Sequence, residues 1–387
     1  MPGHFDSFFQ AGFECSSHRR TDGVRLDLIG ATSHDRHVVG DYRQCADLGL
    51  RTIRDGLRWY LIEKSPGRYD WSSWLPMLEA AEGAGVQVIW DLFHYGSPDH
   101  VDQANPDFPK RFADFAVAAL EVRESVCDTP PLVCPLNEIS FICWAVEVGY
   151  FPNVGPKEVG WLKRHLVRTA VAACTAIRER WPGAAFVWAD PLIHIAPKHH
   201  SRKEIKAAEH ARLGQFQAYD WLMGREEPEL GGRQDFVDVV GVNFYPHNQW
   251  YLDGPTIPMG HHEYRPLADM LVEVAARYDK PVFIAETGAE GSGRPAWLHY
   301  VCDEVRAAQE RSARIDGICL YPVTAYPGWD NSRHAEVGLL STIGSGGKRE
   351  VYGPLFRELQ RQRAIFDIDK PGEPDSVRLR LAGAEGR

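Results

Sequence analysis

Two short segments, Pro135-Leu136-Asn137-Glu138 and Ile284-Ala285-Glu286-Thr287-Gly288, are the most informative part of this sequence about its fold. Each follows an apolar run that is typical of a buried strand, and each carries a glutamate where that strand ends. A lone glutamate in such a place is usually a solvated turn residue. Two of them, separated by several strand-and-helix units, fit strands four and seven of a (β/α)8 barrel, whose active face is formed by the C-terminal strand ends.

The rest of the chain alternates between strand-like and helix-like segments. Eight apolar runs are predicted as strands: residues 7–13, 51–56, 86–93, 132–136, 184–189, 236–243, 281–286 and 317–321. Helical periodicity is found between them, in residues 38–48, 71–84, 108–126, 159–181, 264–278 and 295–314. This alternation predicts parallel strands covered by helices, and eight units favour a closed barrel over an open doubly wound sheet. The turn after the first strand also lacks the G-x-G-x-x-G pattern of nucleotide-binding sheets.

The 387 residues are predicted to form a single barrel domain over residues 1–366, because no linker divides the chain. Residues 367–387 lack periodicity and are predicted to be a flexible tail. The longest non-periodic segments, residues 15–36, 245–263 and 322–349, follow strands one, six and eight. Loops of this length inside a compact domain are usually functional, so we expect them to surround the active face.

Composition excludes several classes of protein. The formal charge of −10 gives no clustered positive surface for nucleic acid, and an uncharged substrate fits it better. The sequence has neither a signal peptide nor an apolar stretch of membrane-spanning length, so we expect a cytoplasmic protein without a membrane partner. Eight cysteines without a CxxC spacing are predicted to be reduced and buried. The pairs His199-His200 and His261-His262 lack a third ligand at zinc spacing, so no metal or other cofactor is predicted.

Two carboxyl groups that converge at one end of a barrel are the minimal set for cleaving a glycosidic bond. One donates a proton to the leaving oxygen, and the other attacks or stabilises the sugar cation. The donor needs a pKa raised by apolar or anionic surroundings, whereas the nucleophile must stay ionised. Glu138 and Glu286 therefore predict an enzyme whose partner is a carbohydrate substrate.

An ordered set of motifs at the predicted strand ends carries a resemblance to a known family. The motifs are Arg51 to Trp59, Trp90 to Tyr95, Asn137-Glu138, Gly241 to Tyr245 and Glu286 to Gly288. In this order and spacing the sequence resembles the clan A glycoside hydrolases, most nearly the family 1 β-glycosidases, over about residues 8–360. The resemblance implies a TIM barrel and a β-glucosidase-like retaining hydrolase that acts on a small β-glycoside or oligosaccharide through a glycosyl-enzyme.

Taken residue by residue, the resemblance implies that Glu138 is the general acid/base and Glu286 the nucleophile. The other matched positions imply contacts with the substrate or the nucleophile: Asn137 with the sugar 2-hydroxyl, His94 with a ring hydroxyl, Arg54 and Tyr245 with the nucleophile, and Trp329 as a platform for the pyranose face.

Several positions depart from the family pattern. Where the family carries a glutamine after strand one and a glutamate before the platform tryptophan, this sequence has Glu14 and Gly328. Recognition of the outer sugar hydroxyls is therefore open, with Glu14, His18 and Asp330 as substitutes by location. Tyr321 stands where a strand-eight tryptophan is usual.

Structural roles compete with functional ones at some sites. Taken alone, Arg54 fits an ion pair with Asp55 or Glu138, and Asp91 and Asp190 fit structural hydrogen bonds. A transglycosylase and a non-catalytic sugar-binding barrel remain alternative functions. The sequence does not determine the sugar, the linkage, the aglycone or the oligomeric state.

Overall fold

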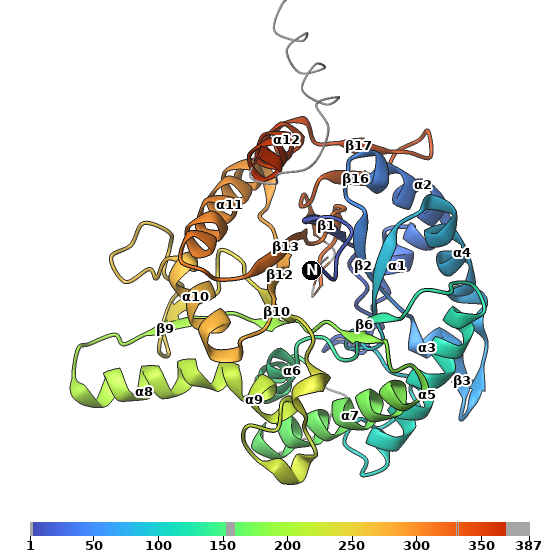
Figure 1. Cartoon of the computed structure of the whole chain (residues 1–387), viewed down its shortest axis with the longest axis horizontal. Helices are drawn as coiled ribbons and strands as arrows, with labels where there is room; N and C mark the ends of the chain where they lie inside the picture. The colour runs from blue at the N-terminus through green and yellow to red at the C-terminus, as the bar shows by residue number, and fades with distance from the viewer. Residues whose placement is uncertain (1–2, 152–158, 330, 332, 369–387) are drawn as a thin grey trace, which may run out of the picture.

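The computed structural model describes residues 3–151, 159–329, 331 and 333–368. Parallel strands form a ring that is surrounded by helices (Figure 1), which confirms the predicted (β/α)8 TIM barrel. The fifth strand is split into β7 and β8, which pair with β6 and β10 respectively, so the ring closes there. The strands of the ring are β1 Phe9–Gly12, β2 Thr52–Gly56, β5 Gln87–Asp91, β6 Leu132–Cys134, β7 Ala185–Phe186, β8 Asp190–Pro191, β10 Val240–Asn243, β12 Val282–Thr287 and β13 Ile315–Leu320.

All six predicted helices are present. In the predicted helix 71–84, a short 3-10 turn precedes α4, which has Pro76 in its first turn and ends at Gly85 with φ 63°. The predicted tail begins inside α12, and residues 369–387 lie outside the described residues. The helices are α1 Leu28–Ala31, α2 His34–Asp47, α3 Trp59–Ile62, α4 Leu75–Ala84, α5 Phe108–Glu124, α6 Ile139–Glu147, α7 Val159–Arg180, α8 Arg202–Leu213, α9 Gln217–Leu222, α10 Leu267–Tyr278, α11 Arg294–Glu310 and α12 Gly353–Ile368.

The strands separate two hydrophobic cores. Because neighbouring residues of a strand point to opposite faces, alternate residues fill the barrel interior. The interior cluster contains Ile89, Leu132, Cys134, Val187, Ala189, Val239, Phe283 and Ala285. A larger cluster lies between the strands and the helices. All eight cysteines are free and seven are buried, which confirms the prediction except for the half-buried Cys127.

The long loops carry small sheets of their own. β9 His194–Ala196 pairs with β11 Gln249–Tyr251, which lies in the loop after the sixth barrel strand. The segment after β13 contains two antiparallel pairs, β14 Tyr326–Pro327 with β15 His334–Ala335 and β16 Leu340–Ile343 with β17 Arg349–Val351. A further pair, β3 Glu63–Ser65 and β4 Arg68–Tyr69, follows the second barrel strand. The described parts of the loops after the sixth and eighth barrel strands therefore extend the barrel with small sheets.

A buried ionic network fixes the segment after β13 to the barrel. Arg349 donates from Nε and Nη2 to Asp41 at 2.7 and 2.9 Å, and His34 lies between Asp41 and Asp55 at 2.7 and 2.8 Å. Burial alone would lower the pKa of His34, but the carboxylates of Asp55 and Asp41 outweigh it and raise that pKa to about 9. The network thus joins α2, β2 and the last loop.

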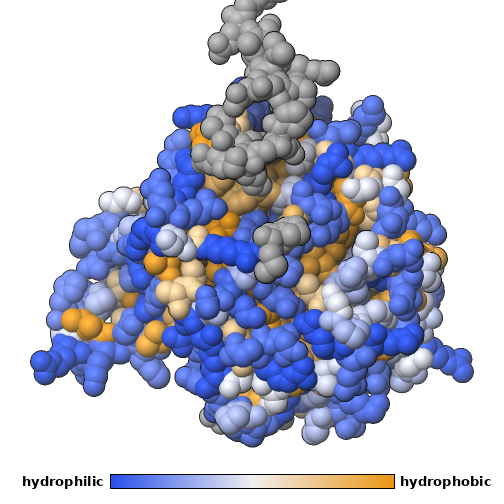
Figure 2. Space-filling view, viewed as in Figure 1, coloured by the Kyte–Doolittle hydropathy of each residue, from blue (hydrophilic) through white to orange (hydrophobic). Residues whose placement is uncertain are grey.

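The face shown in Figure 2 is mostly hydrophilic at its margin, and hydrophobic residues gather between the hydrophilic ones nearer its middle. Among the described helices, none combines the length and the apolar composition needed to cross a bilayer.

Candidate active site

Glu138 lies between β6 and α6, at the residue that immediately precedes the helix, and has the left-handed conformation with φ 51°. Its backbone N–H donates to the carbonyl of Ala189 in the fifth strand at 2.9 Å. The residue is 8% exposed. Asn243 donates to its Oε1 at 2.7 Å, and the hydroxyl of Tyr95 donates to its Oε2. Three neighbouring strand ends therefore fix the backbone and the carboxyl group of Glu138.

Glu286 lies within β12 and is 5% exposed. Each of its carboxylate oxygens accepts one hydrogen bond. Arg54 donates from Nη1 to Oε1 at 2.7 Å, and the hydroxyl of Tyr245 donates to Oε2 at 2.9 Å. A cation and a neutral donor thus face this carboxylate, and they are the two residues that the resemblance placed beside Glu286, Arg54 and Tyr245.

Arg54 connects the two sides of the site. Its Nε and Nη2 donate to Asp91 at 3.0 and 2.8 Å, and Nη2 also donates to Oδ1 of Asn137 at 2.6 Å. The alternative ion pair of Arg54 with Asp55 or Glu138 is wrong. Asp55 points to the opposite face of β2, as adjacent strand residues must, and accepts hydrogen bonds there.

Asn137 and His94 complete a continuous network. Nδ2 of Asn137 donates to the Tyr95 hydroxyl at 2.8 Å and lies 3.2 Å from Nε2 of His94. Nδ1 of His94 lies 2.8 Å from Oδ2 of Asp91. Because Tyr95 also bonds to Glu138, an unbroken path of hydrogen bonds runs from one glutamate to the other.

The two glutamates experience different electrostatic surroundings. Burial and the nearby charge of Glu286 raise the pKa of Glu138 well above its ordinary value. Burial also raises the pKa of Glu286, but the guanidinium of Arg54 opposes that rise. The carboxyl group of Glu138 therefore favours the protonated form more strongly than that of Glu286 does. Asp190, whose pKa burial raises to about 6, adds a smaller upward effect on Glu138.

Glu14 and Tyr321 lie beside His94. Oε1 of Glu14 accepts from the N–H and the hydroxyl of Ser16 at 2.9 and 2.5 Å, and it lies 3.7 Å from Nε2 of His94. The Tyr321 hydroxyl is 3.5 Å from the same nitrogen, and its ring centre is 5.2 Å from the guanidinium carbon of Arg54. Both substituted positions therefore belong to the candidate site.

Trp329 is half-buried in a group of aromatic rings. It lies 5.3 Å from the ring of Tyr95, which connects this aromatic wall to the two glutamates. The other rings near it are His18, Phe141, Tyr150 and Phe151. Gly328 donates to the carbonyl of Arg333 at 2.7 Å, and Asp330 lies outside the described residues.

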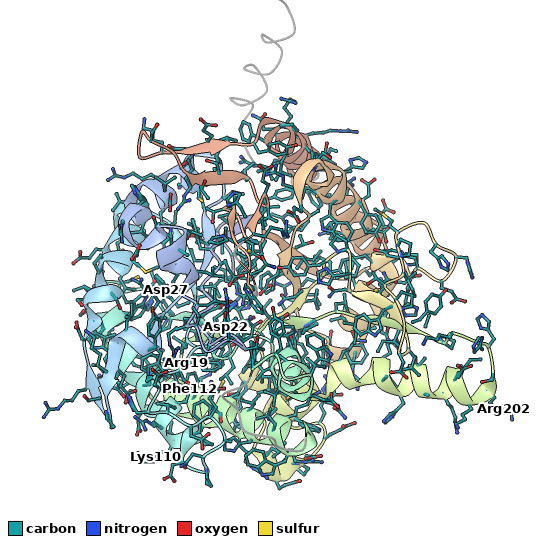
Figure 3. The ribbon with its side chains drawn as sticks, turned by 180° about the vertical axis from the view of Figure 1, so that it is seen from behind. Arg19, Asp22, Asp27, Lys110, Phe112 and Arg202 are labelled. Carbon is teal, nitrogen blue, oxygen red and sulfur yellow. The ribbon has the colours of Figure 1, made fainter. Side chains whose placement is uncertain are left out.

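The loop after β1 lies over the barrel in projection. Seen from behind, its residue Asp22 is drawn nearest the middle of the ring, with the label of Asp27 above it and that of Arg19 below it (Figure 3). The loop is held by Leu26, whose N–H donates to the carbonyl of His18 at 2.8 Å.

Among the described residues, one group has metal-ligating atoms close together: Cys15, Asp91 and His94. Both oxygens of Asp91 already accept hydrogen bonds from Arg54, so a guanidinium occupies the position next to this carboxylate. The paired histidines lie at the surface, where Glu263 is 3.1 Å from Nε2 of His200.

Sequence reasoning missed the roles of Tyr95 and Asn243 as donors to Glu138. Both residues stand inside quoted motifs, one after His94 and the other at the end of β10. The position of both residues at the ends of barrel strands is the sequence signal that could have identified them as site residues. Asp91 and Asp190 make the structural hydrogen bonds that were expected, the latter with Ser140 at 3.0 and 2.6 Å.

No protein-family model matches the sequence, and no curated protein matches it. Solved structures do match over nearly the whole chain. A family 1 β-glucosidase from Thermotoga maritima is 14% identical, with a TM-score of 0.76, over 94% of this chain and 98% of that one. A complex of a Thermotoga maritima β-glucosidase with glucoimidazole is 14% identical, with a TM-score of 0.76, over 95% of this chain and 98% of that one. A complex of a Thermotoga maritima β-glucosidase with castanospermine is 15% identical, with a TM-score of 0.73, over 96% of this chain and 99% of that one. The chain therefore has the (β/α)8 fold of family 1 β-glucosidases, as the resemblance implied.

Proposed function

We propose that this chain is a retaining β-glycosidase that hydrolyses a small β-glycoside or oligosaccharide. The observation that carries the proposal is the pair of buried carboxyl groups, Glu138 and Glu286, in contrasting surroundings within one hydrogen-bond network. The shared fold supports the choice of substrate class, because the matched β-glucosidases bind glucoimidazole and castanospermine.

In the first step, the Glu286 carboxylate attacks the anomeric carbon while the bond to the leaving oxygen breaks. The proton of Glu138 passes to that oxygen, and a glycosyl ester forms on Glu286. In the second step, ionised Glu138 takes a proton from water, whose oxygen attacks the anomeric carbon and frees Glu286. Two inversions at one carbon give overall retention.

The environment of Glu286 suits a nucleophile. Arg54 and Tyr245 donate to its two oxygens and favour the ionised form. The charge of Glu286 in turn raises the pKa of Glu138. Retention requires the two carboxyl groups to lie about 5 Å apart, rather than the roughly 6.5 to 9.5 Å of inverting enzymes, and we therefore expect the shorter separation here.

The remaining residues of the candidate site would bind the sugar. In this proposal Asn137 and His94 contact ring hydroxyls, Trp329 faces the pyranose ring, and Glu14 serves the outer hydroxyls. All but Trp329 are at least nine-tenths buried, so their hydrogen bonds to a sugar would form away from bulk water.

The test is a panel of 4-nitrophenyl glycosides, with the product anomer followed by proton NMR in the first minutes of reaction. We expect hydrolysis of a β-glycoside with the β-anomer of the sugar appearing first. An α-anomer as first product would contradict retention, and formation of new glycosides with added methanol would identify transfer through the same intermediate. Absence of turnover across the panel would favour a sugar-binding barrel.

A further inference from the structure

His34, the first residue of α2, is a fully buried histidine whose two ring nitrogens each face a carboxylate. Nδ1 lies 2.7 Å from Oδ2 of Asp41, and Nε2 lies 2.8 Å from Oδ2 of Asp55. A neutral imidazole has one donor nitrogen and one acceptor nitrogen, so it can donate to only one of two ionised carboxylates. The geometry therefore favours a doubly protonated ring that donates to both.

The charges of this buried network balance when His34 is protonated. Arg349 donates from Nε and Nη2 to the two oxygens of Asp41 at 2.7 and 2.9 Å, so one cation already offsets that carboxylate. Asp55 accepts from the uncharged hydroxyl of Tyr42 at 2.6 Å, and the imidazolium is the cation beside it. Loss of the proton from His34 would leave one buried carboxylate without a balancing charge, which is strongly destabilising.

His34 also contacts residues on both sides of the Arg54 backbone. The ring of Phe13 lies flat on the imidazole, with the ring centres 3.8 Å apart and an angle of 10° between the planes. The backbone N–H of Phe13 donates to the carbonyl of Arg54 at 2.9 Å. Asp55 follows Arg54 in β2 and points to the opposite face of that strand. His34 thus touches both the residue that pairs with Arg54 and the residue that follows it.

The position of Arg54 matters to the candidate site because its guanidinium lies 2.7 Å from Oε1 of Glu286. That contact opposes the rise that burial causes in the pKa of Glu286. Catalytic rates are sensitive to such geometry, and a misplacement of about 1 Å caused from a distance can cost on the order of 100-fold. A residue that fixes the Arg54 backbone can therefore influence the nucleophile without touching the substrate.

We propose that His34 is a positioning residue for the candidate site. Its doubly protonated ring fixes Phe13 and Asp55, and through them it holds Arg54 in contact with Glu286. The kinetic consequences rest on the proposed function, whereas the protonation of His34 and its effect on Arg54 can be measured without a substrate.

The same arrangement predicts a pH dependence of stability. Burial opposes the protonated form, but Asp55 and Asp41 outweigh it and raise the pKa of His34 from 6.5 to about 9. The stability that this raised pKa contributes is complete below about pH 6.5 and is lost as the pH rises through about 9. Burial raises the pKa values of Tyr42 and Cys45, the other titratable groups of α2 beside the network, so both stay neutral over this range.

The first test is NMR of the ring nitrogens in the wild-type protein, with His34 assigned through its contact with the Phe13 ring. We expect both nitrogens to carry a proton at neutral pH. The resonance of the Arg54 Nε–H should move together with the titration of His34 as the pH is raised. An unprotonated ring nitrogen at neutral pH, or an Arg54 resonance that does not follow the titration, would overturn the inference.

The second test measures kcat and KM of His34→Gln for an aryl β-glycoside as a function of pH. We expect kcat to fall about 10- to 100-fold, with a smaller change in KM. The acidic limb should move to higher pH, because Glu286 with a weaker contact to Arg54 ionises less readily. The matched control is His37→Gln, at a half-buried position of the same helix, which should keep the wild-type values.

A charge-balancing variant separates the charge of His34 from its shape. Adding Asp55→Asn to His34→Gln removes the unbalanced carboxylate and should recover part of kcat. No recovery, or a lower melting temperature in His34→Gln with an unmoved acidic limb, would overturn the inference while leaving the glycosidase function in place. If the wild-type protein turned over no glycoside, the proposed function would fail, and the resonances of His34 and Arg54 would still decide the inference.

Discussion

Glu138, in the turn between β6 and α6, and Glu286, in β12, are the same side chain in two different regions of one site. Asn243 and Tyr95, which carry no charge, donate to Glu138. Glu286 faces the guanidinium of Arg54 as well as the hydroxyl of Tyr245. Burial raises the pKa of both, but among the described residues only Glu286 has a cation in direct contact. In the proposed mechanism, position along the barrel therefore selects the two glutamates, whereas their neighbours divide the roles of acid and nucleophile between them.

The largest effect is expected for Glu286→Ala. Without the nucleophile no glycosyl ester forms, so kcat should fall by at least about 10³-fold on every substrate. Azide or formate can enter the vacated space and attack the opposite face of the sugar. We therefore expect these anions to restore cleavage with an inverted product, observed by NMR. Rescue with retention would assign the nucleophile to another residue.

Glu138→Ala should have a smaller effect that depends on the substrate. General acid catalysis contributes about 10²- to 10⁴-fold, so poor leaving groups should lose that much in kcat/KM. A 2,4-dinitrophenyl glycoside, whose leaving group needs no proton, should lose far less. Added azide should then release the glycosyl-enzyme as a retained glycosyl azide. If the two alanine variants exchanged these behaviours, the roles of the two regions would have to be exchanged as well.

A matched pair of tyrosine variants tests the hydrogen-bond donor of each glutamate separately. Tyr245→Phe removes a donor from Glu286, and Tyr95→Phe removes one from Glu138. Loss of a hydrogen bond to an ionised carboxylate should raise its pKa, because the ionised form loses stabilisation. The charged hydrogen bond lost from the nucleophile should also reduce kcat about 10- to 100-fold in Tyr245→Phe.

The two variants should shift opposite limbs of the pH dependence of kcat/KM. Activity rises as Glu286 ionises, so Tyr245→Phe should move the acidic limb to higher pH. Activity falls as Glu138 loses its proton, so Tyr95→Phe should move the basic limb to higher pH. Movement of the same limb in both variants would contradict the division of roles. Thermal melting of both proteins checks that each variant is folded.

The barrel itself could be predicted from the sequence, because its strands are apolar runs and the apolar residues of its helices recur with helical periodicity. The interruption of the fifth strand between β7 and β8 could not be predicted from the sequence, because the residues around Val187 are apolar without a break. The short sheets in the loops were also missed. β9 and β11 are distant in the chain and contain His194 and Gln249, which no hydrophobic alternation marks as strand residues.

At the candidate site, sequence motifs gave the residues but not all of their partners. The pairing of Arg54 with Glu286 was predicted from a resemblance, whereas its bonds to Asp91 and Asn137 depend on how three strands lie side by side. The donor role of Tyr95 was hidden for another reason. Its backbone adopts φ 69°, a left-handed conformation that redirects the side chain and that tyrosine rarely shows.

The smallest expected effect is that of Asp190→Asn, which leaves both glutamates and their donors in place. Asp190 accepts hydrogen bonds from the N–H and the hydroxyl of Ser140, two residues after Glu138, and its charge raises the pKa of Glu138. Lys163 opposes part of that charge, so the effect is modest. Removing the charge should lower the pKa of Glu138 and move the basic limb of kcat/KM to lower pH.

Ser140→Ala is the matched control, because it removes one hydrogen bond to Asp190 and keeps the carboxylate. In this control the basic limb should stay closer to that of the wild type, and kcat at the optimum should change less than about tenfold in either variant. A shift of the acidic limb in Asp190→Asn would mean that Asp190 acts on Glu286 as well. An equal shift of the basic limb in both variants would mean that the geometry of the α6 N-terminus, rather than the charge of Asp190, adjusts the acid. The pair therefore separates electrostatic from positional control on the Glu138 side, where no cation bonds to the carboxyl group among the described residues.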